Sequence, residues 1–534
     1  MSFADKNCWV NIVFPHPPYQ KFTYKIPEKL EDKIEKGQRV LVPLGNRLIS
    51  GFVENFTLKP DLKNIREIVT IIDPEPLLTP DVFELTCWIS SYYLAPWGMV
   101  IKTALPPGIL RKSKKIDHPE KQAKLISPWQ ENIHYETIIH LVREITSEEI
   151  SQIKKKAPAQ ARVLQFLIHH PQGIERKKIK ESMAVLNRLQ EKELISLQKS
   201  EVIRDPYKDI KIMPPRSLQL TSQQKNILKK IRTEISKNHF HPILLHGITS
   251  SGKTQIYIEA IKHIFTKEKS ALVLIPEISL TPQAVQRYKS YFGNRVAVIH
   301  SRMSAGERFD TWRKIKDGTY TIAIGPRSAL FAPLPNLGII IVDEEHDSSY
   351  KQKNPAPRYH ARDGALVRAK INNCVVILGS ATPSLESYHN ALKGKFSLYT
   401  LTHRIDNLPL PKVTLIDHKD TVIKKETRVF CPTLKEYIQK RLENGDQIIL
   451  LQNRRGYATF LRCSSCGNID SCPNCDISLT YHQKNHLLRC HTCGFQKKAP
   501  DSCPCCGGTT ISFRGIGTQR VEEELKKLFP EANS

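Results

Sequence analysis

The stretch Gly247-Ile-Thr-Ser-Ser-Gly-Lys-Thr254 indicates the architecture of the central part of the chain. It follows the apolar run Pro242–Leu245 and precedes a helical pattern from Gln255 to Phe265. The spacing G-x-x-x-x-G-K-[ST] between a strand and a helix predicts a phosphate loop, in which backbone N–H groups surround a triphosphate. Lys253 is expected to reach the β- and γ-phosphates, and Thr254 to bind Mg²⁺. The other predicted nucleotide-binding positions of the loop are Gly247, Ile248, Thr249, Ser250, Ser251 and Gly252.

The stretch Gly338-Ile-Ile-Ile-Val-Asp-Glu-Glu-His346 is an apolar strand that ends in carboxylates. Asp343 fits an outer-sphere partner of Mg²⁺. Glu344 fits the residue that polarises an attacking water, because transfer of a γ-phosphoryl group depends on positioning and charge neutralisation. A charged cluster after a strand is also typical of a solvated turn. Its place downstream of a phosphate loop favours Lys253, Asp343 and Glu344 as catalytic residues.

Six apolar runs, separated mostly by helical patterns, follow one another from about Ser217. This alternation predicts a parallel sheet with helices on both faces. Nearly every run ends in polar residues, which places a ligand site at the carboxyl ends of the strands. The runs are Ile243–Leu245, Ala271–Ile275, Val296–Ile299, Thr321–Ile324, Ile339–Val342 and Val375–Leu378.

The chain has 534 residues and a formal net charge of +27, which together predict several domains and a polyanionic partner. No apolar stretch reaches the roughly 18 to 20 residues that span a membrane. The N-terminus lacks the pattern of a secretory signal. We therefore expect a cytoplasmic protein without a membrane partner, in which clustered cysteines bind metal.

Two segments precede the apolar runs. Residues 1–110 are expected to form a small β-rich domain with a helix at Asp81–Tyr93. Residues 111–215 contain two amphipathic helical patterns, Ala161–His169 and Ser182–Glu193, and the apolar strand Leu194–Leu197. This order suggests a winged helix followed by a linker, and such a module either binds DNA or only packs against a neighbour.

Four C-x-x-C pairs lie near the end of the chain, a spacing that lets two thiolates of one turn hold one tetrahedral Zn²⁺. Eight such ligands predict two closed, structural Cys₄ zinc sites. Disulfides and an iron–sulfur centre are the alternatives. The spacing alone leaves open which pairs share an ion. The pairs are Cys463/Cys466, Cys472/Cys475, Cys490/Cys493 and Cys503/Cys506.

Six motifs in the central part of the chain resemble those of superfamily 2 helicases, and they occur in the same order. The resemblance implies that Gln224 reads the adenine of ATP and that Ser380 and Thr382 link hydrolysis to movement on nucleic acid. The motifs are Leu220–Gln224, the phosphate loop, Ile275–Gln283, Gly325–Ala329, Asp343–His346 and Gly379–Pro383.

A loop between two of these motifs, Ser349–Asp363, interleaves aromatic rings with cations. We expect Tyr350 and Tyr359 to stack on DNA bases, and Arg358 and Arg362 to meet phosphates. A surface loop with incidental charges is the alternative.

The paired zinc sites and the segment Phe513–Leu525 resemble the PriA family of bacterial primosomal replication-restart helicases. The resemblance covers essentially the whole chain and makes Phe513–Leu525 helicase motif V, with Gly517 and Thr518 facing ATP. It implies a pocket for a DNA 3′ end at Phe22, Gly45 and Lys63. It also implies nested zinc sites, with Cys463, Cys466, Cys503 and Cys506 on one ion and Cys472, Cys475, Cys490 and Cys493 on the other.

The expected architecture is a multidomain α/β protein, whose second RecA-like lobe is partial and carries the zinc module as an insertion. The expected parts are a β-rich 3′-end-binding domain (1–110), a winged helix with a linker (111–215), RecA-like helicase lobe 1 (216–432), the start of lobe 2 (433–462), the zinc insertion (463–510) and the motif V segment (511–534).

Because the chain stops at Ser534 without a motif VI, we expect a fragment or a truncated frame, with ATP binding retained and rapid hydrolysis in question. The first hypothesis is an ATP-dependent 3′→5′ DNA helicase that binds forks with a 3′ leading-strand end, with single-stranded DNA-binding protein and other primosome proteins as partners. The second is a zinc-stabilised fork-binding scaffold without catalysis. A third, a duplex translocase sharing the motor, is disfavoured by the zinc insertion.

Overall fold

The computed structural model divides into two compact units, residues 1–409 and 410–534. The residues that it describes are 9–16, 20–58, 60–61, 64–107, 109–110, 134–171, 173–201, 203–204, 206–207, 214, 219–405, 409–416, 429–451, 460–463, 465–475, 477–482, 485–509, 511–514 and 518–533. In these parts of the chain, no helix is long and apolar enough to cross a membrane.

A seven-stranded sheet forms the centre of the first unit, and all its neighbouring strands are parallel. The predicted parallel sheet is confirmed, and each of the six apolar runs contributes a strand. Their order could not be read from the sequence. In sheet order the strands are β11 (Val296–Val298), β12 (Ile322–Gly325), β10 (Ser270–Leu274), β13 (Leu337–Asp343), β14 (Val375–Ser380), β9 (His241–Gly247) and β15 (Ser397–Leu401).

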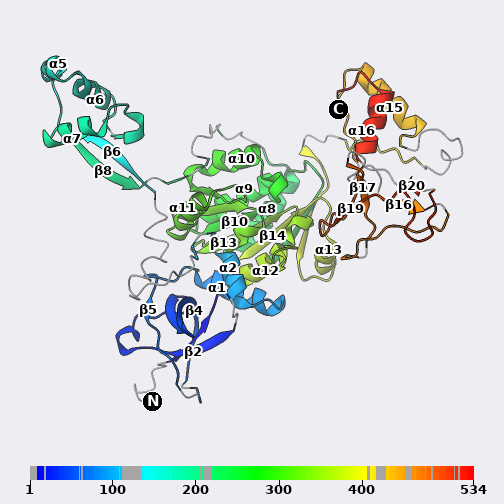
Figure 1. Ribbon diagram of the computed structural model, residues 1–534, viewed down its shortest axis with the longest axis horizontal. Coiled ribbons are helices and arrows are strands. Elements are labelled where there is room, and N and C mark those ends of the chain that lie inside the picture. Colours follow the sequence, from blue (N-terminus) through cyan, green and yellow to red (C-terminus); the bar gives the residue numbers. More distant parts are fainter. Residues whose placement is uncertain are drawn as a thin grey trace. The chain divides into compact units, whose positions relative to one another are not determined.

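Helices cover both faces of this sheet (Figure 1). Successive side chains of a strand point to opposite faces. Accordingly Ile243 and Leu245 of β9 pack with one set of helices, while Leu244 packs with the other. The first set is α8 (Ser222–Ser236), α9 (Lys253–Phe265) and α10 (Pro282–Phe292). The second includes α11 (Ala305–Lys316), α12 (Ala361–Ile371) and the 3₁₀ helix η5 (Arg327–Phe331); α13 (Leu385–Leu392) follows β14.

The N-terminal part is a five-stranded antiparallel sheet followed by two helices. The predicted β-rich domain with a helical end is confirmed. Helix α1 packs against α12 of the central sheet, where Arg368 is fully buried and bonds Asp81. The elements are β1 (Trp9–Val13), β2 (Lys21–Lys25), β3 (Arg39–Leu44), β4 (Arg47–Thr57), β5 (Thr70–Ile71), α1 (Pro80–Tyr92) and α2 (Trp97–Ala104).

Residues 134–201 have a core of their own, in which a three-stranded antiparallel sheet packs with three helices. Both predicted helices and the following strand are present, whereas the winged-helix assignment stays a prediction. Most of the predicted linker lies outside the described residues. The elements are β6 (Tyr135–Leu141), α5 (Ser147–Lys156), α6 (Pro158–Ile168), β7 (Ile174–Glu175), α7 (Met183–Glu191) and β8 (Ile195–Glu201).

The second unit combines a helix pair with a cysteine-rich module. Helices α15 (Pro432–Glu443) and α16 (Thr518–Leu528) share an apolar cluster that includes Ile438 and Phe529. In the module, Cys463 ends a strand, and the other cysteines of the C-x-x-C pairs lie in turns and loops outside the strands of two small antiparallel sheets. The sheets are β16 (Phe460–Cys463) with β20 (Ile511–Arg514), and β17 (Thr480–His482) with β18 (Leu487–Arg489) and β19 (Gln496–Lys498).

Candidate functional site

The phosphate loop joins the carboxyl end of β9 to the N-terminus of α9. Gly252 has φ +83° and caps this helix, a left-handed conformation that favours glycine. Lys253 is almost fully buried, and its Nζ donates a 2.8 Å hydrogen bond to the carbonyl oxygen of Gly247. The loop therefore has the strand–loop–helix form that the sequence predicts, with the lysine folded back over it.

The loop leaves polar groups and space for a phosphate. The hydroxyl oxygen of Ser251 is buried, with no hydrogen-bond partner among the described residues. A Cβ added at Gly247 would lie 2.6 Å from that oxygen, so only glycine leaves the cradle open. Gln224 lies beside the loop, where its Nε2 donates to the carbonyl oxygen of Ser251 at 2.8 Å. These residues fit a nucleoside triphosphate.

Asp343 ends β13 close to the phosphate loop, because only β14 separates β13 from β9. The hydroxyl of Tyr257 donates to Asp343 Oδ1 at 3.0 Å. Burial and the neighbouring Glu344 raise the pKa of Asp343 to about 6, although the Tyr257 hydrogen bond and the charge of Lys253 both oppose this shift. A buried carboxylate facing a lysine in this way fits a divalent cation, which would favour the ionised form.

Glu344 and His346 extend the site towards the Ser-Ala-Thr motif. Glu344 has φ +46°, and its side chain is 36% exposed, so the carboxylate is accessible to water. His346 Nδ1 lies 2.7 Å from the hydroxyl oxygen of Ser380, and its Nε2 lies 3.4 Å from that of Thr382. One imidazole thus connects the carboxylate cluster with both polar residues of the motif.

Glu345 is a buried hydrogen-bond acceptor shared by several residues, and its role was not predicted from the sequence. It is fully buried and accepts hydrogen bonds from the backbone N–H of Ser384 at 2.7 Å and from the hydroxyl of Ser387 at 2.8 Å. Arg362 Nη1 donates to it at 3.2 Å. The third position of an Asp-Glu-Glu run carries no sequence signal that separates a buried anchor from an exposed carboxylate.

The predicted DNA-stacking role of Tyr350 and Tyr359 is wrong for this structure, because both rings are fully buried in the core. The Tyr350 hydroxyl donates to the backbone oxygen of Asp343 at 2.6 Å. Arg362 also points into the protein, where it donates hydrogen bonds to Glu345 and Ser384, and its side chain is only 12% exposed. Arg358 is exposed and remains a candidate for phosphate contact.

The predicted 3′-end pocket lies only partly within the described residues. Phe22 is half-buried on β2, and its ring lies 5.9 Å from that of Phe14. Gly45 is exposed at the turn between β3 and β4 with φ +58°, and the guanidinium of Arg66 donates to its carbonyl oxygen. Lys63 and, in the second unit, Gly517 lie outside the described residues. Thr518 is exposed at the start of α16.

The eight cysteines of the C-x-x-C pairs form two tetrads in the nested order that the resemblance implies. Cys463, Cys466, Cys503 and Cys506 form one, and Cys472, Cys475, Cys490 and Cys493 form the other. The Sγ atoms of the outer tetrad lie 3.7 Å and 3.6 Å apart across its two cross-pairs, and those of Cys472 and Cys493 lie 3.5 Å apart. Two thiolate tetrads of this size fit two structural Zn²⁺ ions.

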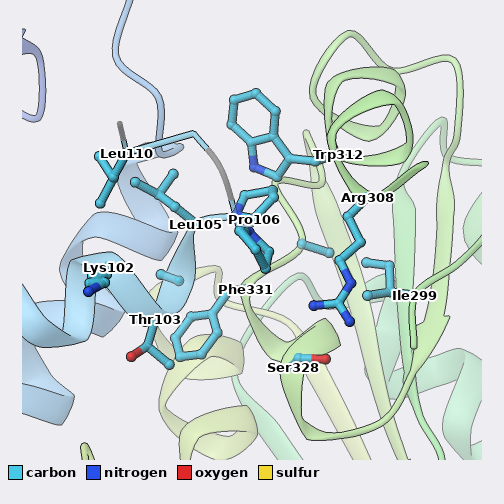
Figure 2. A pocket seen from close by; sticks show the side chains of 13 residues that line it. Lys102, Thr103, Leu105, Pro106, Leu110, Ile299, Arg308, Trp312, Ser328 and Phe331 are labelled. Atoms are coloured by element: carbon cyan, nitrogen blue, oxygen red, sulfur yellow. The ribbon is translucent and has the colours of Figure 1, made fainter. Parts of the chain in front are cut away.

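A separate pocket of about 340 Å³ lies between the segment after α2 and the helices α11 and η5 (Figure 2). Leu105 and Pro106 from the segment after α2 line it together with Trp312 and Phe331, and Arg308 points into it. None of its lining residues belongs to the phosphate loop or the carboxylate cluster. The pocket is therefore distinct from the candidate nucleotide site.

A phosphate loop, a carboxylate cluster and a Ser-Ala-Thr motif on adjacent parallel strands, together with two cysteine tetrads that fit zinc, are the features of a helicase with a cysteine-rich module. Comparisons with known families agree. Residues 11–106 match the PriA 3′DNA-binding domain (3′BD), residues 217–385 the res subunit of type III restriction enzymes, and residues 472–498 the Cys-rich region (CRR) domain of PriA DNA helicase.

Curated relatives match almost the whole chain. Replication restart protein PriA of Bacillus subtilis is 38% identical over 96% of this chain and 70% of its own length. The proteins of the same name from Chlamydia pneumoniae and Chlamydia muridarum are 37% and 36% identical, over 95% of this chain in each case and 66% and 67% of their own lengths. The chain belongs to the replication restart protein PriA family.

Proposed function

We propose that the chain is an ATP-driven 3′→5′ DNA helicase that binds forks during replication restart. The observation that carries this proposal is that His346, whose Nδ1 lies 3.7 Å from a Glu344 carboxylate oxygen, also contacts the hydroxyl oxygens of Ser380 and Thr382. ATP hydrolysis moves a strand only if the site of hydrolysis is linked to the groups that hold DNA, and His346 provides such a link.

Each residue of the site takes a defined part in this proposal. Lys253 leaves the Gly247 carbonyl and binds the β- and γ-phosphates, while the Ser251 hydroxyl and the backbone of the loop hold the remaining oxygens. Mg²⁺, when bound, supplies charge neutralisation between the phosphates. Ionised Asp343 faces that position, and Glu344 orients the attacking water. Gln224 is proposed to read the adenine.

Fork recognition is assigned to other parts of the chain. Phe22, Gly45 and Lys63 are proposed to bind the 3′ end of the leading strand, and Arg358 to meet the DNA backbone. The net charge of +27 supports a polyanionic partner. Single-stranded DNA-binding protein and other primosome proteins are the proposed protein partners. The proposed location is the cytoplasm, at the nucleoid.

The test is steady-state ATP hydrolysis by the chain, with and without a fork that bears a 3′ leading-strand end. Hydrolysis is expected to rise with the fork and to be abolished by Lys253→Ala. Glu344→Gln should bind ATP as the native chain does but not turn it over. A matched control, Lys267→Ala, changes a partly buried lysine that lies beyond the C-terminal end of α9, and it should leave turnover unchanged.

The same assay separates this proposal from its alternative, a zinc-stabilised fork-binding scaffold, which the comparisons do not favour. Tight fork binding without Lys253-dependent hydrolysis would refute the motor proposal for this chain. A fork lacking the 3′ end tests the recognition pocket separately. Phe22→Ala should remove the preference for the 3′ end while leaving hydrolysis on single-stranded DNA intact.

A further inference from the structure

A group of possible metal ligands lies at the opposite end of β9 from the phosphate loop. Glu234 comes from the last turns of α8, His239 from the connection after it, and His241 begins β9. One donor atom of each residue lies within 4.8 Å of the other two. Neither the proposed helicase mechanism nor the cysteine tetrads use these residues.

The distances within this group do not match hydrogen bonds. Glu234 Oε2 lies 3.5 Å from His239 Nε2 and 3.6 Å from His241 Nδ1. Hydrogen bonds between such groups measure about 2.7–3.2 Å. In a tetrahedral zinc site with bonds of about 2.0–2.1 Å to nitrogen and oxygen, neighbouring ligands lie about 3.3–3.4 Å apart. The spacing is therefore closer to that of ligands around a shared ion.

The cysteine tetrads of the same chain provide a reference for this comparison. With Zn–S bonds of about 2.3 Å, neighbouring sulfurs of a tetrahedral site lie about 3.8 Å apart. The Sγ separations in the two tetrads are 3.5, 3.6 and 3.7 Å. The distances from Glu234 to the two imidazoles and the Sγ separations thus come within about 0.3 Å of those that tetrahedral zinc imposes, and the two imidazoles have ligand nitrogens within 4.8 Å of each other.

The surroundings orient the three ligands. The Nε2 of His241 lies 2.9 Å from the Ser397 hydroxyl oxygen, and this contact leaves Nδ1 facing Glu234. Metal-binding imidazoles are commonly oriented by such a partner on their second nitrogen. Lys237 Nζ donates to Glu234 Oε1 at 2.8 Å, leaving Oε2 for an ion.

The three side chains of the cluster are exposed to different extents. The side chains of Glu234 and His241 are 16% and 23% exposed, and that of His239 is 44% exposed. One side of the cluster is therefore open to water, as three protein ligands with a fourth solvent ligand require.

We propose that Glu234, His239 and His241 form a third metal site, which binds one Zn²⁺ or a similar divalent transition metal with a water in the fourth position. The ion joins the end of α8 to the start of β9 and, through Ser397, to the edge strand β15. The site is separate from the candidate nucleotide site, because it lies at the amino end of β9, whereas the phosphate loop lies at the carboxyl end.

Metal stoichiometry tests this proposal. The untagged full chain, with both cysteine tetrads loaded, is equilibrated with buffered Zn²⁺, and the bound zinc is counted. Three equivalents are expected for the native chain and two for His239→Ala, His241→Ala and Glu234→Gln. His239 is the most exposed of the three ligands, so His239→Ala should leave the fold intact and keeps the test valid if His241→Ala destabilises the sheet.

Two control variants exclude other histidines. His263→Ala removes a nearby imidazole on α9 that lies outside the cluster, and His482→Ala breaks the pair with His491, whose Nε2 atoms lie 3.1 Å apart. Both should retain three equivalents. The proposal is overturned if the native chain binds only two equivalents, or if a third persists in His239→Ala and His241→Ala.

Cobalt gives an independent readout of the ligand type. Co²⁺ added as the third equivalent should show visible d–d absorption without the near-ultraviolet thiolate charge-transfer band, because nitrogen and oxygen alone ligate it. A charge-transfer band on the third equivalent would mean that cysteine binds it, which contradicts the site. The melting temperature of the native chain should also rise on binding the third equivalent, and that of His239→Ala should not.

Discussion

Replacing Asp81 with asparagine tests how strongly the N-terminal domain is anchored to the helicase lobe. Asp81 lies at the start of α1, and Arg368, which is fully buried on α12, donates its Nε–H to Asp81 Oδ2 at 2.9 Å. The same guanidinium donates to the backbone oxygens of Leu330 at 2.6 Å and Ala332 at 2.8 Å. Asparagine keeps the shape of the side chain but removes the charge that compensates Arg368.

The expected cost follows from the burial of the pair. Removing one partner of a buried ion pair costs about 3–5 kcal/mol, because the other charge stays buried without compensation. Because two carbonyl oxygens still accept hydrogen bonds from Arg368, we expect a loss of unfolding free energy at the lower end of this range, about 3 kcal/mol. A loss of that size is about a 150-fold change in the unfolding equilibrium at 1.4 kcal/mol per factor of ten.

The matched control is Glu75→Gln, which removes a second ion pair between the same parts of the chain. Glu75 Oε1 lies 3.1 Å from Lys316 Nζ, but its side chain is 58% exposed. An exposed pair contributes about 0–1 kcal/mol, since water and salt screen it. Comparing the two variants therefore isolates burial, because both remove one carboxylate from the contact between these two parts.

Urea unfolding, followed by tryptophan fluorescence, measures both variants. A loss below about 1 kcal/mol for Asp81→Asn, equal to that of Glu75→Gln, would refute the reasoning from burial. The pH dependence supplies a second check. Burial opposes ionisation of Asp81, but Arg368 and the hydrogen bonds from Thr79 and Asn372 outweigh it and lower the pKa. Its stabilisation is thus present above the unfolded pKa and lost as the pH falls through the lower folded value.

Three further predictions concern the site and the zinc module. Because Asp343 titrates at about 6 in the absence of metal, the apparent affinity for Mg²⁺ in ATP hydrolysis should fall as the pH drops through that value, which a titration of Mg²⁺ at several pH values measures. Tyr257→Phe removes a hydrogen bond that favours the ionised form, so it should move this acidic limb to higher pH; an unchanged limb would contradict the assigned contact. Chelation of zinc should unfold the module of residues 460–514, whereas residues 1–409, produced as a separate chain, should keep their circular dichroism and lose only the thermal stability that the proposed third ion adds; loss of signal in both would show that the first unit needs metal in order to fold.

The sheet and the nucleotide site were predictable because each rests on local sequence. The strands that contain Ile243–Leu245 and Ile339–Val342 are continuous apolar runs, as strands buried on both faces must be. Edge strand β15 was missed, since Ser397, Tyr399 and Thr400 leave it only partly buried and its run is not apolar. The order of the strands depends on contacts between distant residues, which one sequence does not reveal.

The aromatic loop shows where pattern alone fails. A loop in which tyrosines alternate with lysines and arginines has the same sequence pattern whether the rings stack on DNA or pack in the core. In this fold Tyr350 and Tyr359 pack in the core. Arg362 likewise looks like a surface cation until Glu345 is seen to be buried beside it. The cysteine tetrads, by contrast, have the pairing that the family resemblance implies and that the spacing of the C-x-x-C pairs leaves open.

The nesting of the cysteine tetrads also sets an order of assembly for the module. The inner contact between Cys472 and Cys493 closes a separation of 21 residues, whereas the outer contact between Cys463 and Cys506 closes 43. Closing a longer loop costs more chain entropy. Once the inner ion is bound, most of the outer loop is already restrained. Closing the outer loop around the second ion therefore costs less chain entropy. Metal loading should therefore be sequential and positively cooperative, with the inner tetrad acting as the nucleus on which the outer one closes.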